Sequence, residues 1–395
     1  MKIAIVGCGF VADFYMASVG YHQNLEICRV FDRDPVRLDE FTKYYSLPTY
    51  NSFDELVSDQ SVELVLNLTN PREHYSVTRA LLEAGKHVYS EKPLAMDYDS
   101  ARELVELSEE KGLYLGSAPC SFLSETAQTI WKALKDDVIG PVRLVYANFD
   151  AGMTHRYPLH KWRSASGALW PAKDEFEVGC TYEHAGYFLT WLAAYFGPAR
   201  NVTAYASCQI PDKGVPVDVI TPDFSVGCIE YDSGIVARVT TSIVAPLDKS
   251  LVIMGDRGVI YTRDMRDDAS PVYVSRTPPG RIGSALEYRL DYWGNRLERV
   301  INWIPWSWGT HWRVKKKYPY AIKPMIRSSG NYKPVDFCRG PAEMAKAIVE
   351  KRPARVSADL GLHITELIEV LQYPQRFAGK KKIKSAFSPI EPSFK

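Results

Sequence analysis

Two stretches of the sequence carry side chains that could move a proton or stabilise a developing charge. The first, AGKHVYSEKPLA at residues 84–95, sets Lys92 between Glu91 and Pro93, where a short β-branched and aromatic run ends. A lysine held there could hydrogen-bond a reacting oxygen and stabilise the charge that develops on it. The alternative is that Lys92 is a solvated loop residue, as most lysines are.

The second stretch lies on a helix that the sequence predicts over residues 181–196. Spacings of three and four place polar or large side chains along one face of this helix: Cys180, Glu183, His184, Tyr187 and Trp191. In a functional interpretation, Tyr187 exchanges a proton with a substrate hydroxyl and His184 is the reserve acid or base. Glu183 then orients substrate hydroxyls. The alternative is a hydrogen-bonded network with only a structural role.

A third motif, GCGFVA, follows the first apolar strand and opens a helix. Gly7 permits a tight turn, Gly9 lets the backbone approach a pyrophosphate, and the small Ala12 allows close helix packing. With Phe10 and Val11 between them, these residues predict a dinucleotide-binding turn at a helix N-terminus.

Asp32 ends the second predicted strand, roughly twenty residues beyond the glycine turn, where a carboxylate would accept hydrogen bonds from the adenosine ribose. Such a carboxylate repels a 2′-phosphate, so the expected cofactor is NAD(H). Arg33 could pair with that phosphate, which leaves NADP open. The alternative role of Asp32 is that of a turn or cap residue.

Metal ions and disulfide bonds are not expected. Cys180, Glu183 and His184 could in principle share a metal ion, but the sequence has no second cluster of histidines or cysteines. Its seven cysteines are scattered and include no CxxC pair, which fits a reducing cytoplasm. A net charge of +1 gives no reason to expect nucleic acid. No apolar run approaches the ~18–20 residues of a membrane span.

The pattern of elements predicts an α/β protein of two domains. Over residues 1–120, short apolar strands alternate with amphipathic helices, which is typical of a Rossmann dinucleotide-binding domain with a parallel sheet. Over residues 121–380, longer valine-rich and tyrosine-rich strands predict an α+β domain with a largely antiparallel sheet. We expect the last helix to pack back near the first domain and residues 381–395 to form a solvated, mobile tail.

Several motifs together resemble one known family: GCGFVA, LTNPREH, AGKHVYSEKPLA and IMGDRGVIY. They resemble the glucose-fructose oxidoreductase, inositol dehydrogenase and rhizopine-catabolism (Gfo/Idh/MocA) family of nicotinamide-dependent oxidoreductases. The resemblance implies a Rossmann domain followed by an open-faced domain, with nicotinamide and substrate at their junction. It assigns Lys92, beside Glu91, to the substrate carbinol, and it places Thr69, Asn70 and His74 near the nicotinamide ribose.

The sequence also departs from the family pattern. Where many relatives have D-x-G-x-H, this chain has EHAGY, so that Glu183 replaces an aspartate and Tyr187 replaces a histidine. The tyrosine has precedent in the family as an acid/base group. LHKWRSASG resembles the W-R element of relatives, which makes His160, Trp162 and Arg163 candidates for substrate contacts. Between these two elements, ALWPAKDEFEVGC replaces a glycine-rich run and suggests a reshaped pocket.

Residues 285–326 concentrate five tryptophans and a run of lysines. Tryptophan beside lysine is typical of a membrane-interface element, so peripheral membrane contact is one interpretation. The others are an oligomer surface, a lid over a large substrate, or ordinary core.

The sequence therefore predicts an enzyme that transfers hydride between NAD(H) and a secondary alcohol or ketone of a sugar, nucleotide sugar or cyclitol. Two alternatives remain open: an epimerase or glycosidase that retains its cofactor with no net redox change, and a non-catalytic nicotinamide-binding regulatory protein. We also expect a homo-oligomer, because an open sheet needs a cover.

Overall fold

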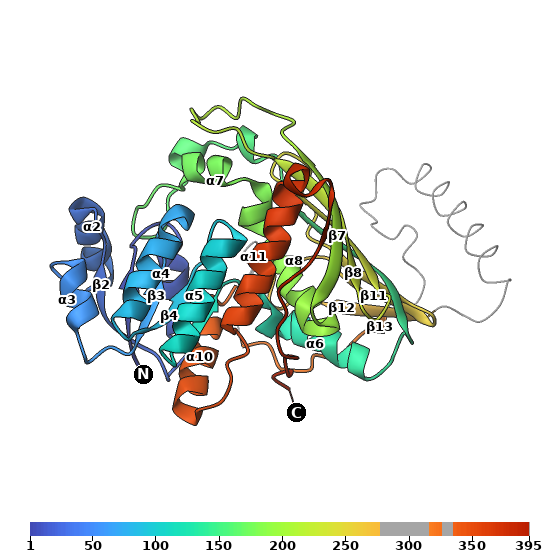
Figure 1. Ribbon diagram of the computed structural model, residues 1–395, viewed down its shortest axis with the longest axis horizontal. Coiled ribbons are helices and arrows are strands. Elements are labelled where there is room, and N and C mark those ends of the chain that lie inside the picture. Colours follow the sequence, from blue (N-terminus) through green and yellow to red (C-terminus); the bar gives the residue numbers. More distant parts are fainter. Residues whose placement is uncertain (277–315, 326–334, 395) are drawn as a thin grey trace, which may run out of the picture.

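The computed structural model describes residues 1–276, 316–325 and 335–394, which form two sheets that stand side by side (Figure 1). The first sheet has five parallel strands in the order β2-β1-β3-β4-β5. They are β1 (Lys2–Val6), β2 (Glu26–Phe31), β3 (Leu64–Asn67), β4 (His87–Ser90) and β5 (Leu115–Ser117). Strand β3 is buried along its whole length, as expected of a parallel sheet that is covered on both faces. The predicted Rossmann domain is confirmed.

Helices connect these strands and pack on the sheet. They are α1 (Ala12–Val19), α2 (Pro35–Tyr45), α3 (Phe53–Ser58), α4 (His74–Glu83) and α5 (Tyr98–Glu110). Asp34 caps α2 and Asp97 caps α5, because each carboxylate accepts backbone N–H groups of the first turn. The sequence did not predict α3, because its six residues are too few to show a helical period.

The second sheet, as far as its residues are described, has nine strands in the order β13-β12-β11-β10-β6-β9-β8-β7-β14. They are β6 (Val142–Asp150), β7 (Ala199–Ser207), β8 (Phe224–Tyr231), β9 (Val236–Ser242), β10 (Leu251–Gly255), β11 (Gly258–Thr262), β12 (Val272–Arg276), β13 (Lys316–Lys317) and β14 (Lys380–Lys382). Only β6 and β9 pair in parallel, whereas the other neighbours are antiparallel. The largely antiparallel second domain is confirmed.

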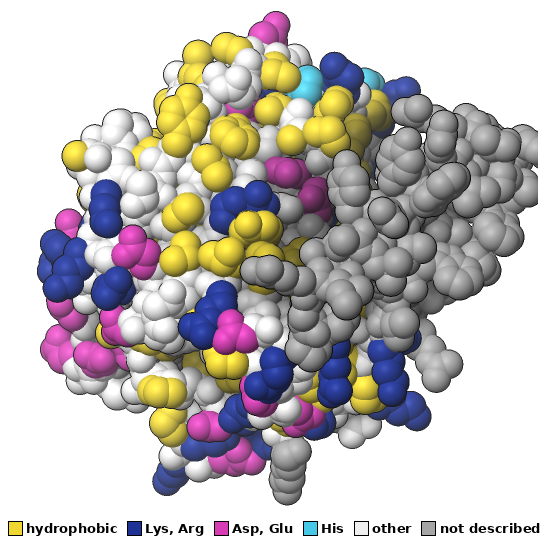
Figure 2. Space-filling model, turned by 90° about the vertical axis from the view of Figure 1, so that its right-hand side faces the viewer, with side chains coloured by type: hydrophobic (Ala, Val, Ile, Leu, Met, Phe, Trp, Pro, Cys, Tyr) yellow, Lys and Arg dark blue, Asp and Glu magenta, His cyan; other side chains and the backbone are white. Residues whose placement is uncertain are grey.

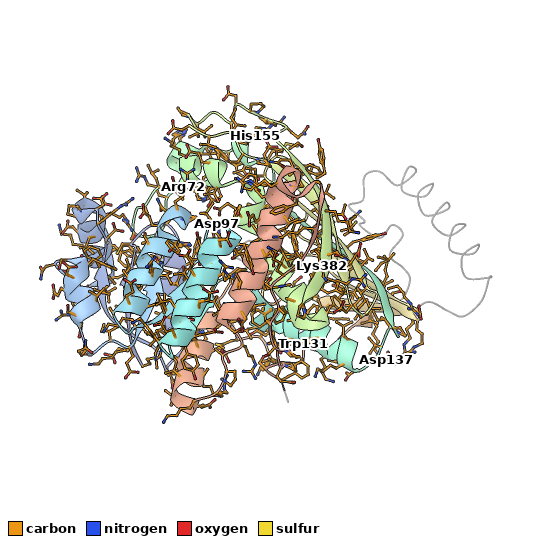
Figure 3. The ribbon with its side chains drawn as sticks, in the orientation of Figure 1. Arg72, Asp97, Trp131, Asp137, His155 and Lys382 are labelled. Atoms are coloured by element: carbon orange, nitrogen blue, oxygen red, sulfur yellow. The ribbon has the colours of Figure 1, made fainter. Side chains whose placement is uncertain are left out.

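The described residues of this half of the chain form five more helices: α6 (Glu125–Lys135), α7 (Ala172–Val178), α8 (Cys180–Phe196), α10 (Arg339–Glu350) and α11 (Ala358–Gln372). Helix α8 packs on the second sheet, and α11 stands between the sheets, against α5 on one side and α8 on the other (Figure 1). At this junction Tyr98 donates its backbone N–H to Glu369 of α11 at 3.2 Å, next to the capping residue Asp97 (Figure 3). The last helix therefore holds α8 in place against the first domain.

The C-terminal end differs from the solvated tail predicted for residues 381–395. Strand β14, which ends at Lys382 (Figure 3), pairs with the edge strand β7. Beyond it, Ile383 and Phe387 are buried, and Ser385 donates its hydroxyl to Glu366 at 2.6 Å. The lysine run misled because the backbone of the strand pairs with the sheet, Lys380 and Lys382 stay exposed at its edge, and Lys381 pairs with the buried Glu366 at 2.9 Å.

Most of the aromatic and basic stretch 285–326 lies outside the described residues, and so do the roles expected of it. In the described part, β13 pairs with β12, and the next residues run along α6. There, Ala321 donates its N–H to Thr129 at 3.0 Å and Met325 to Glu125 at 3.1 Å.

On the face shown in Figure 2, the described lysine and arginine side chains are interspersed with acidic and hydrophobic ones. Within the three described ranges, the helices are too short or too polar to cross a bilayer. The same ranges contain no group of three or more His, Cys, Asp or Glu side chains that could hold a metal ion.

A buried charge cluster joins the two domains at the start of α10. Arg339 donates to Glu125 at 2.7 Å and lies 3.5 Å from Asp268 and 3.6 Å from Asp336. His22 of the first domain lies 2.8 Å from Asp336. Burial raises the pKa of Asp268 to about 7, although Arg339 opposes the rise.

The raised pKa of Asp268 makes stability depend on pH. An aspartate in the unfolded chain has a pKa near ~4. The contribution of Asp268 to the free energy of unfolding is therefore fully present below that pH, and it is lost as the pH rises to the folded pKa of about 7. We expect Asp268→Asn to remove this loss, so that the Tm of the variant gains a few degrees on wild type between about pH 4 and 7. Thermal unfolding across this range checks it, and a constant Tm difference would contradict it.

Candidate active site

A cleft of about 350 Å³ opens between the two sheets, at the carboxyl ends of β3 and β4. This edge is where open parallel sheets bind ligands. The walls of the cleft come from the glycine turn before α1, the segments after β3 and β4, helices α7 and α8, and the second sheet. Arg72, which follows β3, lies beneath α7 and pairs with Glu177 of that helix at 3.1 Å (Figure 3). The pair ties the α7 wall to the first domain.

The glycine turn has the shape that a dinucleotide requires. Gly7 has a φ of +95°, and a Cβ on it would lie 2.6 Å from the carbonyl oxygen of Leu68. Apart from Gly9 and its two chain neighbours, no atom of the described residues lies within 4 Å of the position that a Cβ on Gly9 would take. Ala12 is fully buried at the start of α1. The open space at Gly9 therefore fits a pyrophosphate at the helix N-terminus.

Asp32 serves the turn and also lines the adjoining cavity of about 300 Å³. Its carboxylate accepts the N–H of Cys8 at 2.7 Å and of Asp34 at 2.8 Å. Arg33 lines the same cavity, but its exposed guanidinium is 3.2 Å from the carboxylate of Glu73. Asp32 therefore has the turn role, while its contact with the adenosine ribose stays a prediction, and Arg33 is held by a different partner.

Lys92 follows β4, and its ammonium pairs with the carboxylate of Glu183 on α8. Its backbone N–H donates to Glu91 at 3.0 Å, and Glu91 in turn accepts the buried hydroxyl of Tyr15 at 2.8 Å. Only 17% of the Lys92 side chain is exposed, so it is not a solvated loop residue. Burial disfavours the charged amine, but Glu183 and then Glu175 outweigh burial and raise the pKa of Lys92 above its usual value.

The stripe on α8 divides into a cleft part and a core part. Glu183, His184 and Tyr187 line the cleft. Cys180 packs in a hydrophobic cluster, and Trp191 is buried with its indole N–H donating to Ser121 at 3.0 Å. The three residues predicted to do chemistry are thus together in one cleft with Lys92, while the other two hold the helix.

The protonation of the α8 residues follows from burial and from nearby cations. Burial lowers the pKa of His184 well below its usual value, and Lys92 lowers it further, so the ring is neutral. Burial also raises the pKa of Tyr187, although Arg266 and Lys92 oppose the rise. Tyr187 therefore keeps its proton at neutral pH and can donate it.

Helix α7 adds two carboxylates that the sequence analysis did not single out. Burial raises the pKa of Glu175 well above its usual value, and the adjacent Glu183 adds to the rise. The raised pKa favours the protonated form of Glu175 beside Glu183. Asp174 accepts a hydrogen bond from Asn70 at 2.7 Å, which joins α7 to the first domain. Both residues lie in the stretch ALWPAKDEFEVGC, whose departure from the family pattern was their only signal.

The residues expected near the nicotinamide ribose shape the cleft wall. The ring nitrogens of His74 lie 2.6 Å from the carbonyl oxygen of Pro93 and 2.9 Å from that of Thr69. His74 thereby clamps the segments after β3 and β4 to each other. Thr69 and Asn70 line both this cleft and the adjoining cavity.

Two of the three substrate candidates in LHKWRSASG lie outside the cleft. Trp162 lines it, 6.2 Å from the Phe10 ring and 5.1 Å from the Trp170 ring. His160 is exposed and does not line the cleft. Arg163 folds back on its own turn and donates to the carbonyl oxygen of Gly167 at 2.7 Å. The structure therefore places His160 and Arg163 away from the cleft lining, and their substrate contacts stay a prediction.

The second sheet contributes cleft residues that no motif in the sequence marks. Phe149 of β6 stacks between His184, at 5.1 Å, and Tyr187, at 5.0 Å. Lys249 lies 5.0 Å from the Phe149 ring, and Arg266 lies 4.3 Å from the Tyr187 ring. The strand order of the second sheet brings these residues together in the cleft. Their positions along the sequence do not predict that strand order.

A Rossmann domain whose glycine turn faces a buried lysine and a tyrosine across one cleft is typical of a nicotinamide-dependent oxidoreductase. Comparison with known families agrees. Residues 1–118 match the oxidoreductase family with an NAD-binding Rossmann fold, and residues 127–261 match the GFO/IDH/MocA C-terminal domain. The chain belongs to the Gfo/Idh/MocA family, so the resemblance seen in its sequence is confirmed. It is an NAD(P)-dependent oxidoreductase.

Individual relatives are distant. The trans-1,2-dihydrobenzene-1,2-diol dehydrogenase of Bos taurus is 26% identical over 267 residues, which cover 67% of this chain and 74% of the relative. An uncharacterized oxidoreductase of Synechocystis sp. is 25% identical over 308 residues, which cover 74% of this chain and 80% of the relative.

Solved structures share the fold over nearly the whole chain. The aldose-aldose oxidoreductase of Caulobacter crescentus, complexed with glycerol, has a TM-score of 0.69 at 17% identity and covers 97% of this chain and 99% of its own. The WlbA dehydrogenase of Bordetella pertussis, in complex with NADH and UDP-GlcNAcA, has a TM-score of 0.68 at 14% identity and covers 97% and 98%.

Proposed function

We propose that the protein transfers hydride between NAD(H) and a secondary alcohol or ketone of a sugar, nucleotide sugar or cyclitol. The observation that carries the proposal is the buried pair of Lys92 and Glu183, which stands with Tyr187 in the cleft at the sheet edge where the glycine turn lies. The name of the dihydrodiol dehydrogenase supports the reaction type, and the UDP-GlcNAcA complex of the WlbA dehydrogenase supports a nucleotide sugar as substrate.

Each residue of the cleft has a role in this proposal. The bound nicotinamide gives or accepts the hydride. In the reducing direction, Lys92 hydrogen-bonds the carbonyl oxygen and stabilises the negative charge that develops on it, while Tyr187 donates its proton to that oxygen. Glu183 keeps Lys92 charged and in place. The proton on Glu175 lets two adjacent carboxyl groups coexist beside one ammonium.

The test is the absorbance of reduced nicotinamide over a panel of free sugars, nucleotide sugars and cyclitols, with NAD(H) and NADP(H). We expect a change with one substrate class. A panel with no change would contradict simple dehydrogenation and favour an enzyme that retains its cofactor or a non-catalytic regulatory protein.

Cofactor preference follows from the neighbours of Asp32. We expect NADH to bind at least ~10-fold more tightly than NADPH, because Asp32 repels a 2′-phosphate and Glu73 holds Arg33. The double variant Asp32→Asn, Glu73→Gln removes the repelling charge and frees Arg33, so this preference should fall to near parity. Nicotinamide fluorescence titrations check it, and an unchanged ratio in the variant would contradict it.

A second candidate function is that of an enzyme that retains its cofactor. The hydrogen bonds of the segment 162–170, which we call the strap, favour this candidate. Ser166 donates its N–H and hydroxyl to Asp13 of α1 at 2.9 and 2.7 Å. Arg37 donates to the Ser166 carbonyl oxygen at 2.9 Å and to that of Cys8, inside the glycine turn, at 2.6 Å. The strap is therefore fastened to the nucleotide-binding turn, and a dinucleotide would have to pass it to leave.

For this candidate we expect denatured, freshly purified protein to release stoichiometric nucleotide. Ser166→Ala removes two hydroxyl hydrogen bonds, one to Asp13 and one from Arg37, and should raise the dissociation rate of NADH by roughly 30-fold, at about 1 kcal/mol for each lost bond. Ser76→Ala, on the exposed side of α4, is the control. Nucleotide-free protein that exchanges NADH as fast as the variant would contradict retention.

We further infer a cytoplasmic homo-oligomer. All seven cysteines are free thiols, as a reducing compartment allows. Leu144 and Tyr205 on the strands of the second sheet are 39% and 59% exposed, and a second copy of the chain could cover them. Peripheral membrane contact through 285–326 rests on composition alone. Light scattering tests the assembly, and a monomer would contradict it.

A further inference from the structure

We propose that the substrate carries an anionic group, a carboxylate or a phosphate, and that Arg266 binds it. The inference rests on the proposed function, because it names the substrate class of the same cleft. It makes the substrate an acidic sugar derivative rather than a neutral sugar.

Arg266 is fixed in the cleft by two aromatic rings. It lies in the loop between β11 and β12, and its guanidinium is 4.3 Å from the centroid of the Tyr187 ring and 5.1 Å from that of Phe337. Stacking holds the plane of the guanidinium and leaves its N–H groups at the edge. Its Nη1 atom is buried and has no hydrogen-bond partner in the part of the chain that the structure describes. Among the described residues, no carboxylate lies within 4.0 Å of this guanidinium.

The nearby carboxylates on α7 and α8 have other partners. Glu183 pairs with Lys92, and Asp174 accepts from Asn70 at 2.7 Å. Glu175 keeps its proton. The carboxyl groups on the α7 and α8 side of the cleft therefore have partners within the protein. On the side of the second sheet, the guanidinium of Arg266 faces the cleft. Arg266 is half-buried with its Nη1 atom shielded from water, and among the described residues no anion lies against its guanidinium, so a ligand anion would fill that place.

The position of Arg266 fits an acidic substituent on the substrate whose oxygen reacts in the cleft. The guanidinium of Arg266 is 4.3 Å from the centroid of the Tyr187 ring, and Lys92 lines the same cleft. A substrate whose reacting oxygen contacts Lys92 and Tyr187 can therefore place an acidic substituent against the guanidinium. A planar guanidinium binds carboxylate or phosphate with two parallel hydrogen bonds. A volume of about 350 Å³ holds a monosaccharide ring with such a substituent.

The test is calorimetric titration of the NADH-loaded protein with matched ligands. Glucose, glucuronate and glucose 6-phosphate form one set, and galactose and galacturonate form another. We expect the wild type to bind an acid at least ~10-fold more tightly than its neutral counterpart. Arg266→Gln should abolish the preference, and Arg266→Lys should keep part of it. The uronate and phosphate arms distinguish the two sources of negative charge.

Two controls separate binding from folding. Arg143→Gln removes an exposed arginine that pairs with Asp256 at 2.7 Å, and it should leave the preference unchanged. Arg266→Gln removes two ring contacts but no hydrogen bond of the Nη1 atom, so the ligand-free variant should still unfold cooperatively, with a Tm only slightly below that of the wild type.

Three results would overturn the inference: acids that bind no better than neutral sugars, no binding of any acid, or a preference that survives Arg266→Gln. The heat of binding is measured without hydride transfer. The proposal of an anionic substrate and the proposal of hydride transfer can therefore fail independently of each other. Acid binding that depends on Arg266 but gives no absorbance change would contradict only the proposed function. Turnover of neutral sugars with no acid preference would contradict only this inference.

Discussion

Protein carrying Lys92→Met will lose hydride transfer, with kcat lower by about 10³-fold or more, and will still bind NADH. The loss has that size because one ammonium both hydrogen-bonds the reacting oxygen and stabilises its developing charge. The effect should lie in kcat rather than in the affinity for NADH, since Lys92 pairs with Glu183 across the cleft and not with the glycine turn. Steady-state kinetics with an active substrate, together with NADH titration, measure both quantities.

The substitution also leaves Glu183 buried without its partner, so folding must be checked separately. The double variant Lys92→Met, Glu183→Gln removes both charges and should recover stability but not activity. Lys346→Met is the matched control, because that lysine is exposed on α10 and lies 3.7 Å from Glu350. Activity within a few fold of wild type in Lys92→Met would rule out the assigned role.

The second large effect is expected in the glycine turn. Substitution of Gly7 should lower stability, whereas substitution of Gly9 should weaken NADH binding. Gly7→Ala should destabilise the fold by about 3 kcal/mol or more, because its backbone has a φ of +95° and the new methyl group would lie 2.6 Å from the Leu68 carbonyl oxygen. Chemical denaturation measures the loss.

Gly9→Ala should fold like the wild type, because no atom of the described residues, apart from residue 9 and its two chain neighbours, lies within 4 Å of its added methyl group. It should nevertheless weaken NADH binding by at least ~10-fold, since the methyl group would occupy the space that fits the pyrophosphate. Wild-type affinity for NADH in Gly9→Ala would show that the dinucleotide does not lie against this turn.

The sequence was most informative where function depends on neighbours along the chain. The glycine motif and the strand-helix alternation predicted the Rossmann domain, because turn chemistry and burial period are local properties. Lys92, Glu183 and Tyr187 could be chosen because each lies at a strand end or on a helical period. Their meeting in one cleft nevertheless required the fold.

The sequence was least informative where strand order decides position. Arg266 enters the cleft only because β11 lies two strands from β6, and its loop carries no motif. Glu175 comes from a short helix in a stretch that could be recognised only as unusual. Arg163, which matched a motif, instead bonds to its own turn.

The central claim is that this cleft moves hydride from a carbinol carbon with the help of Lys92. The most direct test incubates the NAD-loaded protein with the small-molecule extract of cells grown in heavy water, whose sugars and nucleotide sugars carry deuterium on carbon. Mass spectrometry of the nucleotide then reports transfer from any substrate in the extract, whether or not the cofactor is released. We predict one deuterium gained by the nicotinamide in the wild type and none in Lys92→Met. No deuterium in either protein, or equal labelling in both, would contradict the claim.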